Sequence, residues 1–167
     1  MAYYFLRGPM PKENAMQVKE VLRVKGNTLY TVAPESHLSE AVITMADQDI
    51  GSLIVMEGGK LVGMLTFREV IAMLAKRQKE RRVGPTPTFA EIKVKEAMHR
   101  EPIVTNPDMD VDELRSLMLQ NHARYVPVME GETLLGVISF HDVAKAVLEE
   151  RNFENRMLKG YIKNWPA

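Results

Sequence analysis

The sequence contains the same ten-residue pattern twice, as LVGMLTFREV at residues 61–70 and as LLGVISFHDV at residues 134–143. In each copy an apolar run with a glycine ends at a hydroxyl residue, and a carboxylate follows three positions later. Thr66 with Glu69 fits the capping box, in which two side chains bond the free amides at the start of a helix. Each copy therefore predicts a strand that leads directly into a helix.

The sequence around this pattern is duplicated as well. VMEG recurs at residues 55–58 and 128–131, in the same register with a shift of 73. Further upstream, VKEVL at residues 18–22 matches VKEAM at residues 94–98 with a shift of 76, so the first copy carries three extra residues near residue 26. A repeat that keeps its register over two separate blocks predicts two copies of one structural unit.

The pattern of each copy predicts the order β-α-β-β-α. A short extended segment stops at a proline-containing turn, and an amphipathic helix follows, as shown by the helical spacing of Leu38, Ala41, Val42 and Met45. Two strands around a glycine turn form a hairpin, and a final helix closes the unit. Such a unit leaves one apolar face of its sheet uncovered. We therefore expect an α/β (α+β) fold in which two repeats pack about a pseudo-two-fold axis.

The predicted domain limits follow from the repeat. Gly84, Pro85 and Pro87 break the helical pattern between the copies and indicate a linker. The predicted segments are an N-terminal extension (1–16), the first repeat (17–80), the linker (81–93), the second repeat (94–150) and a C-terminal helix with a tail (151–167).

The composition narrows the classes of function. Lys plus Arg equal Asp plus Glu at 22 each, which argues against nucleic-acid binding; KRQKERR at residues 76–82 is the one basic cluster. The absence of cysteine excludes disulfides, zinc–thiolate sites and thiol nucleophiles. No apolar stretch approaches the roughly 20 residues of a membrane span, and no catalytic or metal-binding motif is found. We expect a cytoplasmic protein that is not an enzyme and does not enter the membrane.

Paired units that each end in G-h-h-S/T-x-x-D/E, where h is apolar, resemble the tandem cystathionine-β-synthase (CBS) domains, also called the Bateman module. HARYVPVMEGETLLGVISFHDV at residues 122–143 is similar to the RhxPV strand, turn and closing motif of that family. EERNFENRMLKGYI at residues 149–162 resembles the C-terminal helix of small stand-alone CBS-pair proteins. The apolar face of this helix is expected to pack on the module or on a second chain, and it consists of Phe153, Met157, Leu158, Tyr161 and Ile162.

The resemblance implies a nucleotide site at the second copy. In the family the Ser/Thr and Asp of the closing motif bind adenine nucleotides, and these roles fall on Ser139 and Asp142. The chemistry suits them, because a helix N-terminus attracts phosphate and an ionised carboxylate can accept both hydroxyls of a ribose diol. In the first copy Glu69 replaces the usual Asp, and its extra methylene favours a capping role for Thr66 and Glu69 over ligand binding.

Other residues are implicated by the same resemblance. Arg124 precedes the strand YVPV and is expected to meet phosphates, whereas the equivalent position of the first copy holds Gly51. Arg68 is expected to reach phosphates across the pseudo-two-fold axis. The remaining residues are expected to flank or line the adenine pocket, and they are Thr105, Asn106, Ala123 and Val137. For each of these residues a surface, turn or core role is the alternative interpretation.

The predicted function is that of a non-enzymatic sensor, which binds AMP, ATP or NAD(H) as a regulatory ligand in the cleft between the repeats. No cofactor is required. The resemblance also implies a homodimer, and the regulatory signal would pass to an unknown protein effector. The alternative is an interaction or structural protein whose nucleotide site has decayed. Binding of RNA or DNA through residues 76–82 is a further, less favoured hypothesis.

Overall fold

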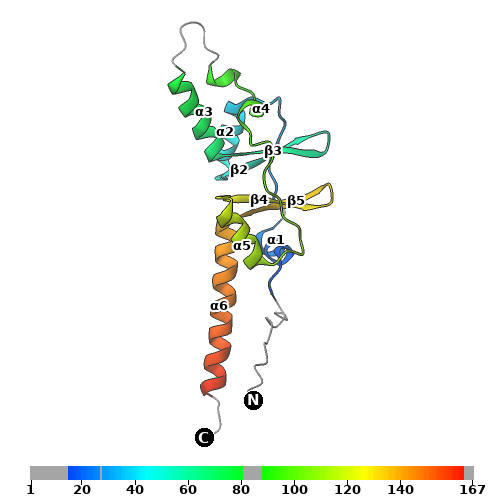
Figure 1. The fold of residues 1–167 in the computed structure, drawn as a ribbon, viewed down its shortest axis with the longest axis vertical. Helices are drawn as coiled ribbons and strands as arrows, with labels where there is room; N and C mark the ends of the chain where they lie inside the picture. The colour runs from blue at the N-terminus through cyan, green and yellow to red at the C-terminus, as the bar shows by residue number, and fades with distance from the viewer. Residues whose placement is uncertain (1–14, 27, 81–87, 164–167) are drawn as a thin grey trace, which may run out of the picture.

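The computed structural model of the chain describes residues 15–26, 28–80 and 88–163. Most of the predicted N-terminal extension, the first part of the predicted linker and the last four residues lie outside these ranges. Figure 1 shows two small α+β units stacked along the long axis of the molecule, with their hairpins facing each other at the centre. The predicted fold class of two β-α-β-β-α repeats is confirmed.

The first repeat forms a three-stranded sheet in the order β1-β2-β3. Strand β1 is parallel to β2, and β2 is antiparallel to β3. Its elements are β1 (Thr31–Val32), α2 (Leu38–Asp47), β2 (Ser52–Glu57), β3 (Lys60–Thr66) and α3 (Phe67–Lys79). Thr66 is the N-cap of α3, and the predicted capping box with Glu69 is present.

The second repeat has a two-stranded sheet, in which β4 is antiparallel to β5. The strand equivalent to β1 is reduced to a single parallel bridge between Thr105 and Val128. Its main elements are α5 (Val111–Gln120), β4 (Tyr125–Glu130), β5 (Thr133–Ser139) and α6 (Phe140–Lys163). Asp110 caps α5, because its carboxylate accepts the amides of Asp112 and Glu113.

The two hydrophobic cores exchange helices between the repeats. Helix α1 (Val18–Lys25) contacts β5 and α6 and lies at the level of the second repeat in Figure 1, and its Val18 and Val21 belong to the core of that repeat. The short segments η1 (Phe89–Glu91) and α4 (Val94–Ala97) lie beside α2, and Val94 belongs to the core of the first repeat. Each hydrophobic core therefore contains a helix from the other sequence repeat.

Equivalent backbone hydrogen bonds hold both exchanged helices. The amides of Val18 and Lys19 donate to the carbonyl oxygens of Met109 and Pro107, at 3.0 and 2.9 Å. In the other repeat the amides of Val94 and Lys95 donate to Ser36 and Pro34, at 2.9 and 3.0 Å. The free amides at a helix start need such partners, so each exchanged helix begins where the other repeat supplies carbonyl groups.

Helix α6 continues without a break from the second repeat to Lys163, past the limit predicted at residue 151. Every side chain from residue 151 to 163 is exposed, including Phe153 at 61% and Ile162 at 76%. Of the two expected partners of this apolar face, the module is excluded, because α6 projects beyond the second repeat (Figure 1); packing on a second chain stays a prediction. Among the described residues, no helix combines the length and apolar character needed to cross a membrane.

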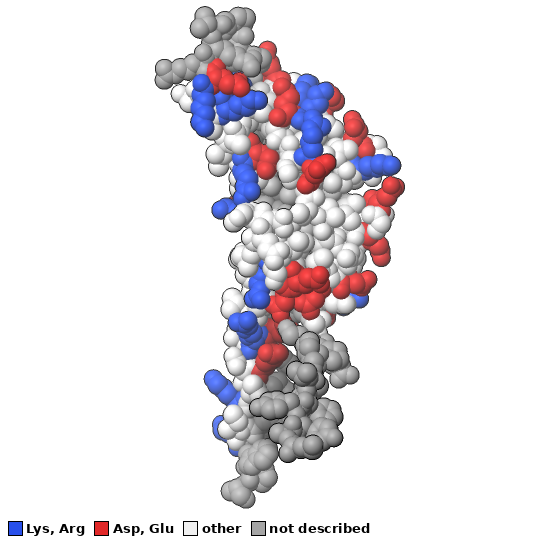
Figure 2. All heavy atoms as spheres, viewed as in Figure 1, with Lys and Arg blue, Asp and Glu red and all other residues white. Residues whose placement is uncertain are grey.

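Basic and acidic side chains are interspersed on the face shown in Figure 2, in keeping with the equal counts of the sequence. The predicted basic cluster begins in the last turn of α3, where Lys76, Arg77 and Lys79 stand. Arg81 and Arg82 lie outside the described residues.

Candidate functional site

Two cavities lie at equivalent places between the repeats. The Ser139 cavity has a volume of about 630 Å³, and the Thr66 cavity has a volume of about 640 Å³. Each takes one wall from the closing motif of one repeat and the other wall from the opposite repeat. Arg124 and Tyr125 line both cavities and form the partition between them.

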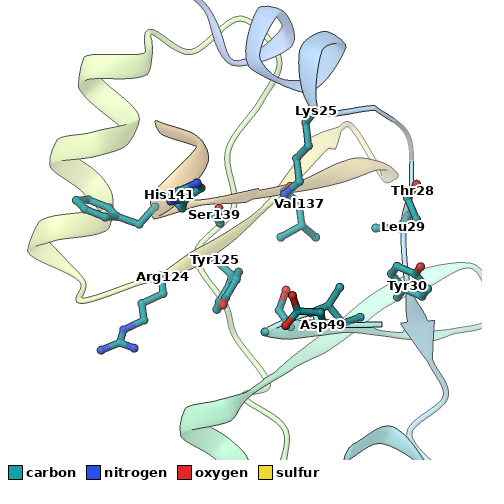
Figure 3. Close-up of a pocket in the computed structure, with 14 residues that line it drawn as sticks. Lys25, Thr28, Leu29, Tyr30, Asp49, Arg124, Tyr125, Val137, Ser139 and His141 are labelled. Carbon is teal, nitrogen blue, oxygen red and sulfur yellow. The ribbon is translucent and has the colours of Figure 1, made fainter. Parts of the chain in front are cut away.

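The Ser139 cavity combines polar groups of the second repeat with an apolar wall of the first. Val137 and Ser139 come from the end of β5, where the chain passes into α6. Leu29, Tyr30 and Ile50 come from the first repeat. Figure 3 shows Val137 and Ser139 on one side and Tyr30 with Asp49 on the other. A pocket with an apolar wall and a few converging polar groups is the usual form of a small-molecule site.

Ser139 and Asp142 form a reciprocal cap at the start of α6. The Asp142 carboxylate accepts the Ser139 amide at 2.8 Å, and the Ser139 hydroxyl oxygen accepts the Asp142 amide at 3.1 Å. The Lys25 ammonium donates to the same Asp142 oxygen, Oδ2, at 2.7 Å. Asp142 is therefore joined to the wall of the cavity through Lys25, which lines it.

The Asp142 carboxyl is held in its ionised form. Partial burial by itself raises the pKa of this carboxyl, but the hydrogen bonds from Lys25 and Ser139 and the charge of Lys25 outweigh it. The pKa of Asp142 consequently lies below its ordinary value. An ionised carboxylate at this position offers acceptors only, which is the state that a diol ligand requires.

The structure divides most of the predicted site residues between the two cavities, but Asp142 is not among the residues that line either one. Val137, Ser139 and Arg124 line the Ser139 cavity, although the guanidinium of Arg124 points away from Ser139 in Figure 3. Four other predicted site residues line the Thr66 cavity, and they are Thr66, Arg68, Glu69 and Ala123.

Thr105 and Asn106 line neither cavity. Thr105 is 3% exposed and bridges to Val128 within its own repeat. Because the pseudo-two-fold axis faces the closing motif of one repeat toward the other repeat, the partners of Ser139 come from the first copy. The prediction drew them from the second copy, and the structure does not bring Thr105 and Asn106 to Ser139.

Several wall residues of the Ser139 cavity were not found from the sequence, among them Lys25, Leu29, Tyr30 and Ile50. Ile50 is the counterpart of Ala123 at the shift of 73. Applying this shift to the predicted adenine pocket would have pointed to Ile50. Lys25 has no such signal, because it lies where the first copy carries its extra residues.

The Thr66 cavity differs from the Ser139 cavity in the hydrogen bonds of its closing-motif carboxylate, Glu69. Glu69 accepts the Thr66 amide at 2.8 Å and also bonds the Thr66 hydroxyl. The Arg68 guanidinium donates to the carbonyl oxygen of His122, in the second repeat, at 3.0 Å. Glu69 and Arg68 are thus engaged in a helix cap and in a contact between the repeats.

The CBS domain family model matches residues 18–76 and 94–149. The curated CBS domain-containing protein YhcV of Bacillus subtilis is 32% identical over 68% of this chain and 75% of its own length. A crystal structure of a CBS-domain containing protein from Agrobacterium tumefaciens has 30% identity and a TM-score of 0.69, over 78% of this chain and 98% of that chain.

Two further comparisons concern ligands and enzymes. The crystal structure of the CBS domain pair of protein MJ0100, in complex with 5'-methylthioadenosine and S-adenosyl-L-methionine, has 21% identity and a TM-score of 0.68, over 82% of this chain and 99% of that chain. An inosine-5'-monophosphate dehydrogenase of Methanocaldococcus jannaschii is 28% identical over 77% of this chain, but the match covers only 23% of that enzyme. Together with the two-repeat fold and the two equivalent cavities, these matches show that the chain belongs to the CBS domain family and contains a tandem CBS pair.

Proposed function

We propose that this CBS pair is a regulatory module that binds an adenine nucleotide, such as AMP, ATP or NAD(H), in the Ser139 cavity. The observation that carries the proposal is Ser139 on the cavity wall at the start of α6, opposite an apolar wall from the other repeat and bonded to the ionised Asp142. The MJ0100 pair was crystallised with two adenosine-containing ligands, which supports an adenosine ligand for a CBS pair of this fold.

Each part of such a ligand has a counterpart on the wall of the cavity or, for Asp142, directly beside a wall residue. The hydroxyl of Ser139 and the start of α6 suit a phosphate, because a helix N-terminus carries a partial positive charge. The Asp142 carboxylate suits the ribose diol. Leu29, Ile50 and Val137 offer an apolar surface for the adenine ring.

The regulatory mechanism is a linkage between ligand binding and the arrangement of the repeats. The walls of the cavity come from both repeats, so a bound nucleotide contacts both and favours the arrangement for which it has the higher affinity. An effector protein that reads this arrangement would then respond to the nucleotide concentration.

The test is calorimetric titration of the purified chain with AMP, ATP, NAD and S-adenosylmethionine. We expect at least one of them to bind and Asp142→Ala to lose that binding. Glu69→Ala is the matched control, because it removes the carboxylate at the equivalent position of the Thr66 cavity. It should lower stability by about 1 kcal/mol, the value of a helix cap, and leave binding in place.

Two results would contradict the proposal in different ways. If none of the four ligands binds, the interaction or structural role with a decayed site becomes the better explanation. If Glu69→Ala removes binding and Asp142→Ala does not, the ligand occupies the Thr66 cavity instead.

A further inference from the structure

Lys25 stands on the wall of the Ser139 cavity and bonds two residues of the closing motif, Val137 and Asp142. It is the last residue of α1, and Figure 3 shows its side chain reaching from that helix toward Val137. Its ammonium donates to Asp142 Oδ2 at 2.7 Å and to the carbonyl oxygen of Val137 at 2.8 Å. The Lys25 side chain is 34% exposed and that of Asp142 is 20% exposed. Lys25 lines the cavity, and Asp142 is joined to the cavity wall through it.

The helix cap does not account for this ion pair. Ser139 and Asp142 already satisfy each other's amides, and Thr66 with Glu69 caps α3 without a lysine. The wall of the Thr66 cavity holds an acidic residue, Glu101, and no lysine is among the residues that line it. The lysine is therefore a feature of the Ser139 cavity alone.

A lysine ammonium and a ribose diol compete for the same acceptor. The ammonium has three donors and no acceptor, and the two hydroxyls of a diol donate to the same carboxylate lone pairs. Oδ2 of Asp142 already accepts the Ser139 amide and the Lys25 ammonium. A diol that engages both carboxylate oxygens must therefore take the place of the ammonium at Oδ2.

We propose that Lys25 is an internal competitor for Asp142, which a bound adenosine ligand must displace, and that it gives the cavity a preference for phosphorylated ligands. This inference rests on the proposed function. The displaced ammonium remains at the cavity wall, where a phosphate of the ligand provides a new anionic partner. An unphosphorylated adenosine leaves it without one. Lys25 thus opposes the binding of adenosine more strongly than the binding of AMP or ATP.

The experiment compares the affinities of adenosine and AMP for the wild-type chain and for Lys25→Met, which keeps the apolar stem and removes the charge. We expect Lys25→Met to bind adenosine roughly 5-fold more tightly, as for the loss of a competing ion pair of about 1 kcal/mol. The affinity for AMP should rise less or fall, so that the preference for AMP over adenosine decreases.

Lys19→Met is the matched control. Lys19 stands on the same helix and also pairs with an aspartate of the second repeat, Asp108, at 2.9 Å, but neither residue lines the cavity. Its substitution should leave both affinities unchanged. Carbon-detected NMR titration of the Asp142 carboxyl provides a readout without ligand, since its pKa should be higher in Lys25→Met than in the wild type.

The outcomes separate the two proposals. If the wild type binds AMP and Lys25→Met binds adenosine no more tightly, Lys25 is not a competitor, although the proposed function stands. If Lys25→Met loses affinity for adenosine, Lys25 contacts the ligand and the inference is overturned. If neither protein binds any adenine ligand, the proposed function fails and the inference fails with it.

Discussion

The phenol of Tyr125 occupies the space that a side chain at position 51 would need. A Cβ built on Gly51 would lie 1.7 Å from the Tyr125 hydroxyl oxygen and 2.5 Å from its Cζ atom. Position 51 is the counterpart of Arg124, and its glycine looked in the sequence like the loss of a phosphate-binding arginine. The structure gives a packing reason instead, because Tyr125 from the other repeat closes the space between the two cavities.

Gly51→Ala is therefore expected to destabilise the chain by about 1–2 kcal/mol, because the Tyr125 ring must move to admit the methyl group. The same substitution in a Tyr125→Ala background should cost much less. Urea denaturation of the four proteins in this cycle measures the coupling. Additive costs would show that Tyr125 is not the obstacle.

Gly63 and Gly136, at equivalent places in β3 and β5, should respond differently to alanine. A Cβ at Gly63 would lie 2.8 Å from the Met98 sulfur and 2.9 Å from the His99 carbonyl oxygen, whereas at Gly136 the closest atom is Leu22 Cδ2 at 3.0 Å. A backbone carbonyl group cannot move aside as easily as the methyl group of a leucine side chain can. We expect Gly63→Ala to cost about 2–3 kcal/mol and Gly136→Ala about 1 kcal/mol or less, as measured by urea denaturation. Equal costs would contradict this explanation.

The ion pair of Asp142 should make stability depend on pH in the acid range. The pKa of its carboxyl is lower in the folded protein than the roughly 3.9 of an unfolded chain. The stabilisation is thus fully present above about pH 4 and is lost as the pH falls through the folded pKa. Denaturation from about pH 7 to about pH 2 should show the wild type more stable than Asp142→Asn by about 1 kcal/mol at neutral pH, with the difference vanishing in acid. A difference that persists in acid would exclude the carboxylate charge as its source.

A chain that ends at Glu150 tests the exposed part of α6. The described residues removed are exposed, so the free energy of unfolding per monomer should change by less than about 0.5 kcal/mol. We propose that the apolar face of this segment packs on a second copy of the chain. Sedimentation velocity should then show a dimer for the full chain and a monomer for the shortened one. A shortened chain that remains a dimer would place the interface elsewhere.

The sequence predicted those features that depend on neighbouring residues. The hairpins, the cap at Thr66 and the stripe that contains Leu38 and Met45 are set by local spacing, and each is present. The duplication in the sequence predicted that the chain contains two such structural units. Together they led to the fold without any knowledge of distant contacts.

The features that the sequence did not predict depend on residues far apart in the chain. Lys25 meets Asp142 over a separation of 117 residues, and no periodicity marks that pair. Thr105 was assigned to the site because it stands near the right motif, yet the two-fold axis turns it into the core of its own repeat. The division of the site residues between two cavities depends on how the two repeats pack, which local spacing does not encode.

The exchange of α1 and α4 has a consequence for how the chain is made. Helix α1 leaves the ribosome early, but its partners follow late; the side chain of Gln17, for example, bonds the carbonyl oxygen of Asp108, 91 residues further on. At about 5–20 residues per second, synthesis of that separation takes several seconds, during which Val18 and Val21 lack their native cover. Neither half of the chain made alone contains a complete core. Two fragments divided at the linker should therefore fold only when they are mixed, and their recovery would follow second-order kinetics.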